Sequence, residues 1–329
     1  MLDVADEQSM RRDVTWKGVF WIASGVPVLV LFTIGSIGAT ALGISWLVWI
    51  ISILMGFSQS FTYAEIAGLF PGKSGGASVY GAIAWVRYSK WIAPVSVWGN
   101  WYAWSPVLAI GTGLASGYIL TYLFPADSKI NTWGVTLVNL GFLREGLELR
   151  ISAAFFLSVL ILLFIFWVQH KGIAGTAKFA IFLGVAGLVP LTIIALIPLF
   201  TGDVVSSNFS PLAPIIGENG AGVWGMAGWK LFLGALFICG WSTYGFETAV
   251  CYTSELKDPK RDTIRAVVYS GLLSIFLFFT IPFVFQGHLG IAGLSAPDIY
   301  SGMGVAKAMA LGIGSARWIE GIVVLMLLI

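Results

Sequence analysis

Long apolar stretches recur along this chain, and they constrain its fold more than any other feature. A helix crosses the hydrocarbon core of a bilayer with about 20 consecutive apolar residues, and with more when it is tilted. Seven stretches reach that length, and an eighth begins near Arg317; the seven lie at approximately 16–41, 46–70, 91–124, 151–168, 173–200, 231–253 and 264–287. The sequence therefore predicts an all-α polytopic membrane protein whose surroundings are the lipid bilayer.

Composition excludes several other classes of protein. Only 10% of the residues are charged and 58% are hydrophobic, whereas a soluble domain carries roughly 25% charged residues. The net charge of +2 comes without a Lys/Arg cluster suited to nucleic acid. Cys239 and Cys251 lie in one apolar stretch, which indicates neither a disulfide framework nor a metal site. No nucleophile is paired with a base, so we expect neither an enzyme nor a bound cofactor.

The distribution of Lys and Arg predicts the orientation, because cytoplasmic loops carry an excess of both. With the N-terminus inside, twelve of them lie in cytoplasmic segments: Arg11, Arg12, Lys17, Lys73, Arg87, Lys90, Lys171, Lys178, Lys257, Lys260, Arg261 and Arg265. Six lie outside: Lys129, Arg144, Arg150, Lys230, Lys307 and Arg317. We therefore predict a multi-pass protein of the plasma or inner membrane with a cytoplasmic N-terminus. Its two long outside loops, 125–150 and 288–316, either cap a vestibule or form surface hairpins.

The first span contains a sequence that interrupts a helix. In Ala23-Ser24-Gly25-Val26-Pro27, Pro27 has no N–H, so the carbonyl of Ala23 loses its helical partner. Gly25 lowers the cost of unwinding, and proline suits the first turn of a new helix. A half-helix that begins here would direct free backbone N–H groups at the membrane midplane. Such groups form a site for an anion.

The sixth span contains a second candidate interruption, because residues 240–247 hold two glycines, two hydroxyl residues and an acid. Irregular backbone at membrane depth is tolerated only where it lines a cavity or is buried in protein. Spans one and six are where two inverted five-helix repeats each place a discontinuous helix, with a ligand between them. The alternative is that these glycines and prolines serve only packing or kinking.

Four motifs carry a resemblance to a known family. They are Ser24-Gly25-Val26 in the first span, Trp241-Ser242 with Gly245 and Glu247 in the sixth, Ala64-Glu65-Ile66-Ala67 with Phe70-Pro71 and Gly75-Gly76-Ala77-Ser78-Val79-Tyr80 after the second, and Ser254-Glu255-Leu256-Lys257-Asp258-Pro259-Lys260-Arg261 after the sixth. In this order they resemble the amino acid–polyamine–organocation superfamily over essentially the whole chain. The first motif departs from the family pattern, because Ala23 stands where a glycine is common.

The resemblance implies a leucine-transporter-type fold of five plus five inverted repeats. Residues 1–15 would be a cytoplasmic tail, 16–200 the first repeat and 201–329 part of the second. That template continues beyond Ile329, so we expect a fragment, truncated in the eighth span, that does not transport alone. The implied function is secondary active transport of amino acids by alternating access. An exchanger of polyamines or other organic amines, or a transport-fold amino-acid sensor, is the alternative, and the oligomeric state stays open.

The resemblance also implies a substrate site at the two breaks. Its residues would be Ala23, Ser24, Gly25, Val26, Trp104, Trp241, Ser242, Tyr244 and Gly245. Free N–H groups of the first break would bind the carboxylate of the substrate, and freed carbonyls of both breaks would bind its ammonium group. Trp241, Tyr244 and Trp104 would cover the substrate side chain. A single deep acid favours a carboxylate-bearing substrate over a polyamine.

Two acids are candidates for coupling and gating. Glu247 is predicted to lie in mid-membrane, where an acidic residue is a functional hypothesis by default. It would exchange a proton during transport, or else serve as a neutral structural acid. Glu65, at the inner end of its span, is expected to form a gating or topology ion pair. The coupling ion, a proton or sodium, stays open; the lysine that some proton-coupled relatives carry in the fifth span would fall near Gly187 and is absent.

Overall fold

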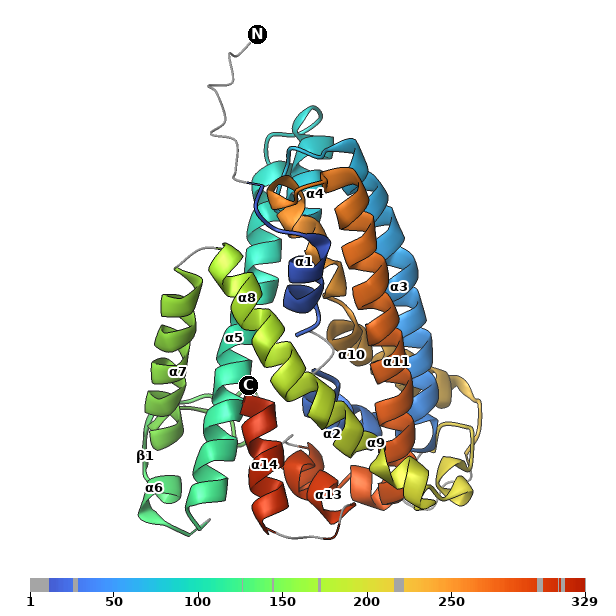
Figure 1. Ribbon diagram of the computed structural model, residues 1–329. Helices are drawn as coiled ribbons and strands as arrows, with labels where there is room; N and C mark the ends of the chain where they lie inside the picture. Colours follow the sequence, from blue (N-terminus) through green and yellow to red (C-terminus); the bar gives the residue numbers. More distant parts are fainter. Residues whose placement is uncertain are drawn as a thin grey trace.

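The computed structural model of the protein describes residues 12–25, 29–125, 127–143, 145–170, 173–215, 222–300, 304–312, 314 and 317–328. Helices dominate these ranges and run mostly along one long axis (Figure 1). Within the described ranges, four stretches are long and apolar enough to cross a membrane by length and composition, at 33–69, 92–123, 178–201 and 259–294. The predicted spans one and six are each interrupted, because helical backbone stops at Ala23 in the first and at Thr243 in the sixth.

The first half of the chain forms the following elements. They are α1 (Trp16–Ala23), α2 (Leu29–Ala41), η2 (Leu42–Ile44), α3 (Ser45–Leu69), α4 (Ala77–Val86), α5 (Ile92–Leu123), α6 (Lys129–Thr132), β1 (Gly134–Asn139), β2 (Glu148–Ser152) and α7 (Ala153–Gln169). Strands β1 and β2 pair antiparallel, so the outside loop predicted at 125–150 is largely a hairpin.

The second half continues with a fifth span that changes helix type. The elements are α8 (Ile173–Leu183), the π-helical turn η3 (Gly184–Leu188), α9 (Val189–Thr201), η4 (Ser206–Phe209), α10 (Met226–Thr243), η5 (Phe246–Glu255), α11 (Pro259–Leu294), α12 (Pro297–Tyr300), α13 (Val305–Leu311) and α14 (Arg317–Leu328). Most helix ends lie within a few residues of the predicted spans.

The predicted end of the seventh span at residue 287 lies three residues before a break in α11. Helical backbone stops at Gly290, where φ is 66° and ψ is −179°, and a second helical segment follows to Leu294. His288, predicted to lie in the loop, is therefore in the last turn before the break. A positive φ of this kind is readily adopted only by glycine, which explains why the chain changes direction at this residue.

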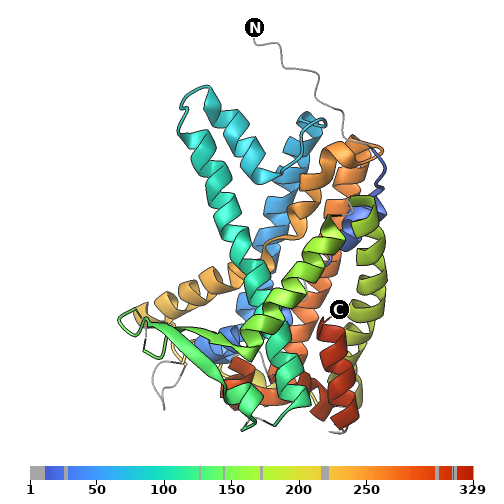
Figure 2. The ribbon, with the colours of Figure 1, turned by 90° about the vertical axis from the view of Figure 1, so that its left-hand side faces the viewer.

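The core of the bundle forms where α3 packs against α10 and α11 (Figures 1 and 2). Trp49 on α3 is fully buried and stacks on Phe278 of α11, with ring centroids 5.5 Å apart. At the end of the bundle farther from the N-terminus, the buried Gln286 side chain accepts from the N–H of Trp46 (3.0 Å) and donates to the carbonyls of Gly43 (2.9 Å) and Asn208 (3.1 Å). This amide fixes α3, η4 and α11 to one another at that end.

Candidate functional site

The first span is interrupted at the predicted position. Helix α1 ends at Ala23, and the chain becomes helical again at Leu29. The N–H and the Oγ of Ser24 both donate to the carbonyl of Phe20, at 2.9 and 2.7 Å. The prediction that the Ser24 N–H is a free donor is therefore wrong for this structure, because Ser24 caps α1. The N–H of Gly25 has no hydrogen-bond partner among the described residues, and Val26 lies outside them.

The sixth span is interrupted by two residues of non-helical backbone. Helix α10 ends at Thr243, Tyr244 is extended (φ −101°, ψ 138°), and Gly245 has a φ of 136°. The span then resumes as the 3-10 segment η5. The hydroxyl of Thr243 is hydrogen-bonded to that of Ser52 on α3 at 2.7 Å, which fixes the end of α10. The carboxylate of Glu247 accepts from the N–H of Gly245 at 2.8 Å and satisfies a donor that the break leaves free.

The two interrupted spans pair half by half. Helix α1 packs against η5, and α2 packs against α10. The segment before α1 also joins the end of η5 through an isolated parallel bridge between Val14 and Leu256. The N–H of Val14 donates to the carbonyl of Glu255 (3.3 Å), and the N–H of Lys257 donates to the carbonyl of Val14 (3.0 Å). Helix α1 and η5 are thus joined by backbone hydrogen bonds as well as by side-chain packing.

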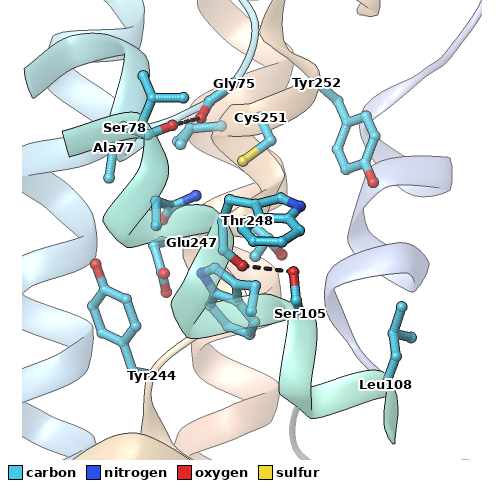
Figure 3. Close-up of a pocket in the computed structure, with 15 residues that line it drawn as sticks. Gly75, Ala77, Ser78, Ser105, Leu108, Tyr244, Glu247, Thr248, Cys251 and Tyr252 are labelled. Carbon is cyan, nitrogen blue, oxygen red and sulfur yellow. Dashed lines mark hydrogen bonds between the residues drawn. The ribbon is translucent and has the colours of Figure 1, made fainter. Parts of the chain in front are cut away.

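A cavity of about 460 Å³ opens beside the break in the sixth span, between α4, α5 and η5 (Figure 3). It is lined by Gly75, Ala77, Ser78, Val97, Asn100, Trp101, Trp104, Ser105, Leu108, Tyr244, Glu247, Thr248, Val250, Cys251 and Tyr252. Figure 3 shows Glu247 and Thr248 of η5 on one side of it and Ser105 of α5 on another. The predicted residues Trp104, Tyr244 and Glu247 therefore share one cavity.

The lining of this cavity combines one acid with aromatic walls. Glu247 is the only residue of the lining with a charged side chain, and it is 6% exposed. The indole rings of Trp101 and Trp104 belong to the wall that α5 contributes. Tyr244 is held by the hydrogen bond that its hydroxyl donates to the Tyr63 hydroxyl at 2.9 Å. A carboxylate facing aromatic rings suits an organic cation, because the ring faces attract positive charge.

The first break lines a different cavity, so the predicted substrate residues do not all meet. This second cavity has a volume of about 190 Å³ and is lined by Trp21, Ile22, Ser24, Gly25, Ala180, Leu183, Gly184, Gly187, Leu188, Leu191, Met326 and Leu327. It contains Gly187, a buried residue of η3. Every residue of its lining is uncharged, and η3 supplies part of its wall.

The other predicted residues lie outside both cavities. Ala23 and Ser242 are buried, and the Ser242 Oγ has no hydrogen-bond partner within the part of the chain that the structure describes. Trp241 is 43% exposed on α10. Glu65 is exposed on α3 and makes no ion pair with a described residue, so its gating role stays a prediction.

Several residues of the larger cavity were not predicted from sequence. Apart from Trp104, which was predicted, the wall from α5 consists of Val97, Asn100, Trp101, Ser105 and Leu108. Their spacing of three and four residues places them on one face of a helix. Two polar side chains, Asn100 and Ser105, recur on that face within an apolar span, and this pattern would have identified the wall. Thr248 directly follows Glu247, Cys251 lies four residues after it, and both share its cavity.

A comparison with protein families matches nearly the whole chain. The family described as "Amino acid permease" matches residues 14–329. The match begins at Val14, the residue that bridges to Leu256, and it includes both interrupted spans and every residue that lines the two cavities.

Proposed function

This chain belongs to the amino acid permease family, and from that premise we propose that it moves its substrate by alternating access and holds it at the interrupted spans one and six. Membership makes it an integral, multi-pass membrane protein of a family that transports amino acids or related organic substrates. The observation that carries the proposal is the break at Tyr244 and Gly245, which opens beside a cavity that contains Glu247.

In this proposal the first break supplies a donor for the carboxylate of the substrate in a conformation that joins the two cavities, which are separate in this structure. The N–H of Gly25 has no partner among the described residues and lies between the end of α1 at Ala23 and the start of α2 at Leu29. Backbone N–H groups at the N-terminus of a half-helix bind anionic substrate groups in transporters of this architecture. In this proposal Ser24 orients the break through its cap on Phe20 and does not contact the ligand through its N–H.

The sixth span supplies the group for the ammonium end of the substrate and for coupling. Glu247 is buried beside the break, and its carboxylate accepts a hydrogen bond from the N–H of Gly245. We assign it to ammonium binding and to proton exchange during the transport cycle. Tyr244 and Trp104 would close over the substrate side chain, since both line the cavity. In the five-plus-five reading, residues 16–200 supply the first break and the α5 wall, and residues 201–329 supply the second break.

Two other functions make different predictions. An exchanger of polyamines would need several acids in its site, whereas Glu247 is the only acid in the lining of the larger cavity and the lining of the smaller cavity has none. A sensor would bind an amino acid without accumulating it. The single acid therefore favours a substrate with one ammonium group over a polyamine.

The proposal is tested by uptake into proteoliposomes that contain the purified full-length protein, since this chain alone is not expected to transport. The panel consists of labelled amino acids and polyamines, each with and without an inward proton gradient or an inward sodium gradient. We expect accumulation of one class of amino acid. Accumulation of polyamines alone would contradict the substrate assignment. Saturable binding without accumulation, even with counter-substrate inside, would make the protein a sensor.

A further inference from the structure

The hairpin β1–β2 is amphipathic. Its register pairs Val135 with Ile151 and Val138 with Leu149, and it pairs Thr136 with Arg150. Because successive side chains of a strand point to opposite faces, the aliphatic pairs share one face and the polar pair lies on the other. A bulge at residue 137 keeps this alternation in register with β2.

The polar face of the hairpin is internally satisfied. Thr136 donates to the carboxylate of Glu148 at 2.7 Å, and the Arg150 guanidinium donates to the carbonyl of Thr132 at 2.7 Å. Asn139, beside Glu148 in the register, accepts from the N–H of Gly141 at 2.7 Å and stabilises the turn. This face is therefore suited to water.

The aliphatic face is not covered by any described part of the chain. The exposed aliphatic and aromatic residues of the hairpin and its turn are Val135, Leu137, Val138, Phe142, Leu143, Leu147 and Leu149, and Phe142 is 80% exposed. A contiguous apolar surface on a folded protein marks a site of interaction. The question is which partner fits it.

The hairpin continues directly into a helix whose apolar surface faces outward. Strand β2 ends at Ser152, and α7 begins at the next residue. Phe156, Leu160 and Leu163 are each more than half exposed on α7, so in a membrane protein they face lipid. Trp133, at the foot of the hairpin, stacks on Phe156 with ring centroids 6.3 Å apart. Tryptophan at such a junction is typical of the membrane–water boundary.

The placement of the hairpin agrees with a membrane partner. Figure 2 shows it leaving the foot of α7 and projecting sideways from the bundle, with its turn above the lowest helices and not below them. An arm that projects sideways is directed toward the lipid that surrounds a membrane bundle and away from the axis of that bundle. Its unpaired strand edges must remain at headgroup level, because open sheet edges do not occur in the hydrocarbon region.

We propose that the β1–β2 hairpin is a monotopic membrane anchor that lies in the headgroup–acyl boundary of the leaflet farther from the N-terminus. Its aliphatic face and the Phe142–Leu143 turn enter the acyl region, and the face with Thr136, Glu148 and Arg150 stays in water. The partner is the phospholipid surface itself, bound in the manner of an interfacial amphipathic element. This inference does not depend on the substrate or on the coupling ion.

Spin labels on adjacent residues test the proposal in liposomes. In a background with Cys239→Ser and Cys251→Ser, one variant carries Leu149→Cys on the aliphatic face, and its matched control carries Glu148→Cys on the polar face. Collision of each label with oxygen, which concentrates in lipid, is compared with collision with a water-soluble nickel complex. We expect the oxygen-to-nickel ratio to be several-fold higher at position 149 than at position 148.

Two other results would overturn the anchor. Equal and high nickel accessibility at both positions would place the hairpin in water. Low accessibility to both reagents at position 149 would mean that protein covers the aliphatic face. A label at Phe142→Cys, in the turn, gives the same comparison without altering a strand, so the test does not depend on whether the Leu149 variant folds.

Discussion

At the scale of single residues, the site depends on one buried carboxylate. Glu247 accepts from the N–H of Gly245 and lines the same cavity as Tyr244 and Trp104. A glutamine at this position keeps the size and the acceptor oxygen of the side chain but cannot exchange a proton. The substitution therefore separates a role in coupling from a role in folding.

Glu247→Gln is expected to abolish the dependence of uptake on a proton gradient while the protein still folds. Without proton exchange the gradient cannot drive accumulation, so accumulation should fall to the level that is measured without a gradient. The measurement is uptake in proteoliposomes with and without the gradient. Glu145→Gln, an exposed acid near the hairpin turn, is the matched control. If uptake by the Glu247 variant still depends on the gradient, Glu247 has a structural role and does not couple transport to protons.

The two cysteines provide a test of access to the cavity. Cys251 lines the cavity, whereas Cys239 on α10 is fully buried. A membrane-impermeant thiol reagent is expected to modify Cys251 and to be slowed by bound substrate, and Cys239 should not react. Labelling of Cys251→Ser and Cys239→Ser variants, read by mass spectrometry, distinguishes the two sites. If substrate does not slow the reaction at Cys251, the substrate does not occupy this cavity.

Sequence patterns predict single residues of this site unevenly. Glu247 is predictable because an acid within an apolar span is rare, and Trp104 lies on a helical stripe of polar and aromatic residues. The capping of α1 by Ser24 was not predictable, since it depends on Ser24 keeping a helical backbone after the last residue of α1. The separation of Gly25 from Glu247 into two cavities depends on tertiary packing, which spacing along the chain does not encode.

At the scale of elements, the interruption of the sixth span depends on one glycine. Gly245 has a φ of 136°, which residues with a side chain rarely adopt. Gly240, five residues earlier, lies within α10, where an added methyl group would meet no neighbouring atom within 4 Å. A side chain is therefore unfavourable at Gly245 and tolerated at Gly240, although both glycines lie in one span.

Gly245→Ala is expected to destabilise the break by about 1–3 kcal/mol through backbone strain, and Gly240→Ala should be neutral or slightly stabilising because alanine favours a helix. Thermal unfolding of both variants in detergent gives the comparison, and uptake shows whether the geometry of the break is needed. Equal midpoints for the two variants would mean that Gly245 does not need its positive φ.

The elements themselves were largely predictable, and their irregularities were not. Helix lengths follow from the thickness of a bilayer, so long apolar stretches predict where the helices lie. The π-helical turn η3 has no such signal in the sequence. Gly184, at its start, lies so close to the Trp21 ring that an added Cβ would come within 2.3 Å of a ring carbon. The turn therefore accompanies a close approach of α1 to the fifth span, which only the assembled bundle reveals.

At the scale of the whole molecule, the bridge between Val14 and Leu256 joins chain segments that are more than 200 residues apart. Val14→Pro removes the N–H that donates to the carbonyl of Glu255. A lost hydrogen bond of this kind costs about 1 kcal/mol, so we expect a lower unfolding midpoint. Thr15→Pro is the control, because the Thr15 N–H donates no hydrogen bond to a described residue. Similar loss in both variants would show that the proline ring, and not the bridge, is responsible.

The pairing of half-helices also determines where the backbone of the sixth span would bend. Helix α1 packs against η5 and α2 packs against α10, and in the sixth span the covalent joint between the two pairs is only Tyr244 and Gly245. Rotation of one pair against the other would be absorbed by about four backbone dihedral angles in that joint. Both residues have non-helical backbone, and the Gly245 carbonyl accepts only the first hydrogen bond of η5, from the N–H of Thr248 at 2.9 Å, so such a rotation leaves α10 and the rest of η5 intact. The joint would therefore act as a hinge between helices that stay rigid, and the packing of those helices would limit the angle of the rotation.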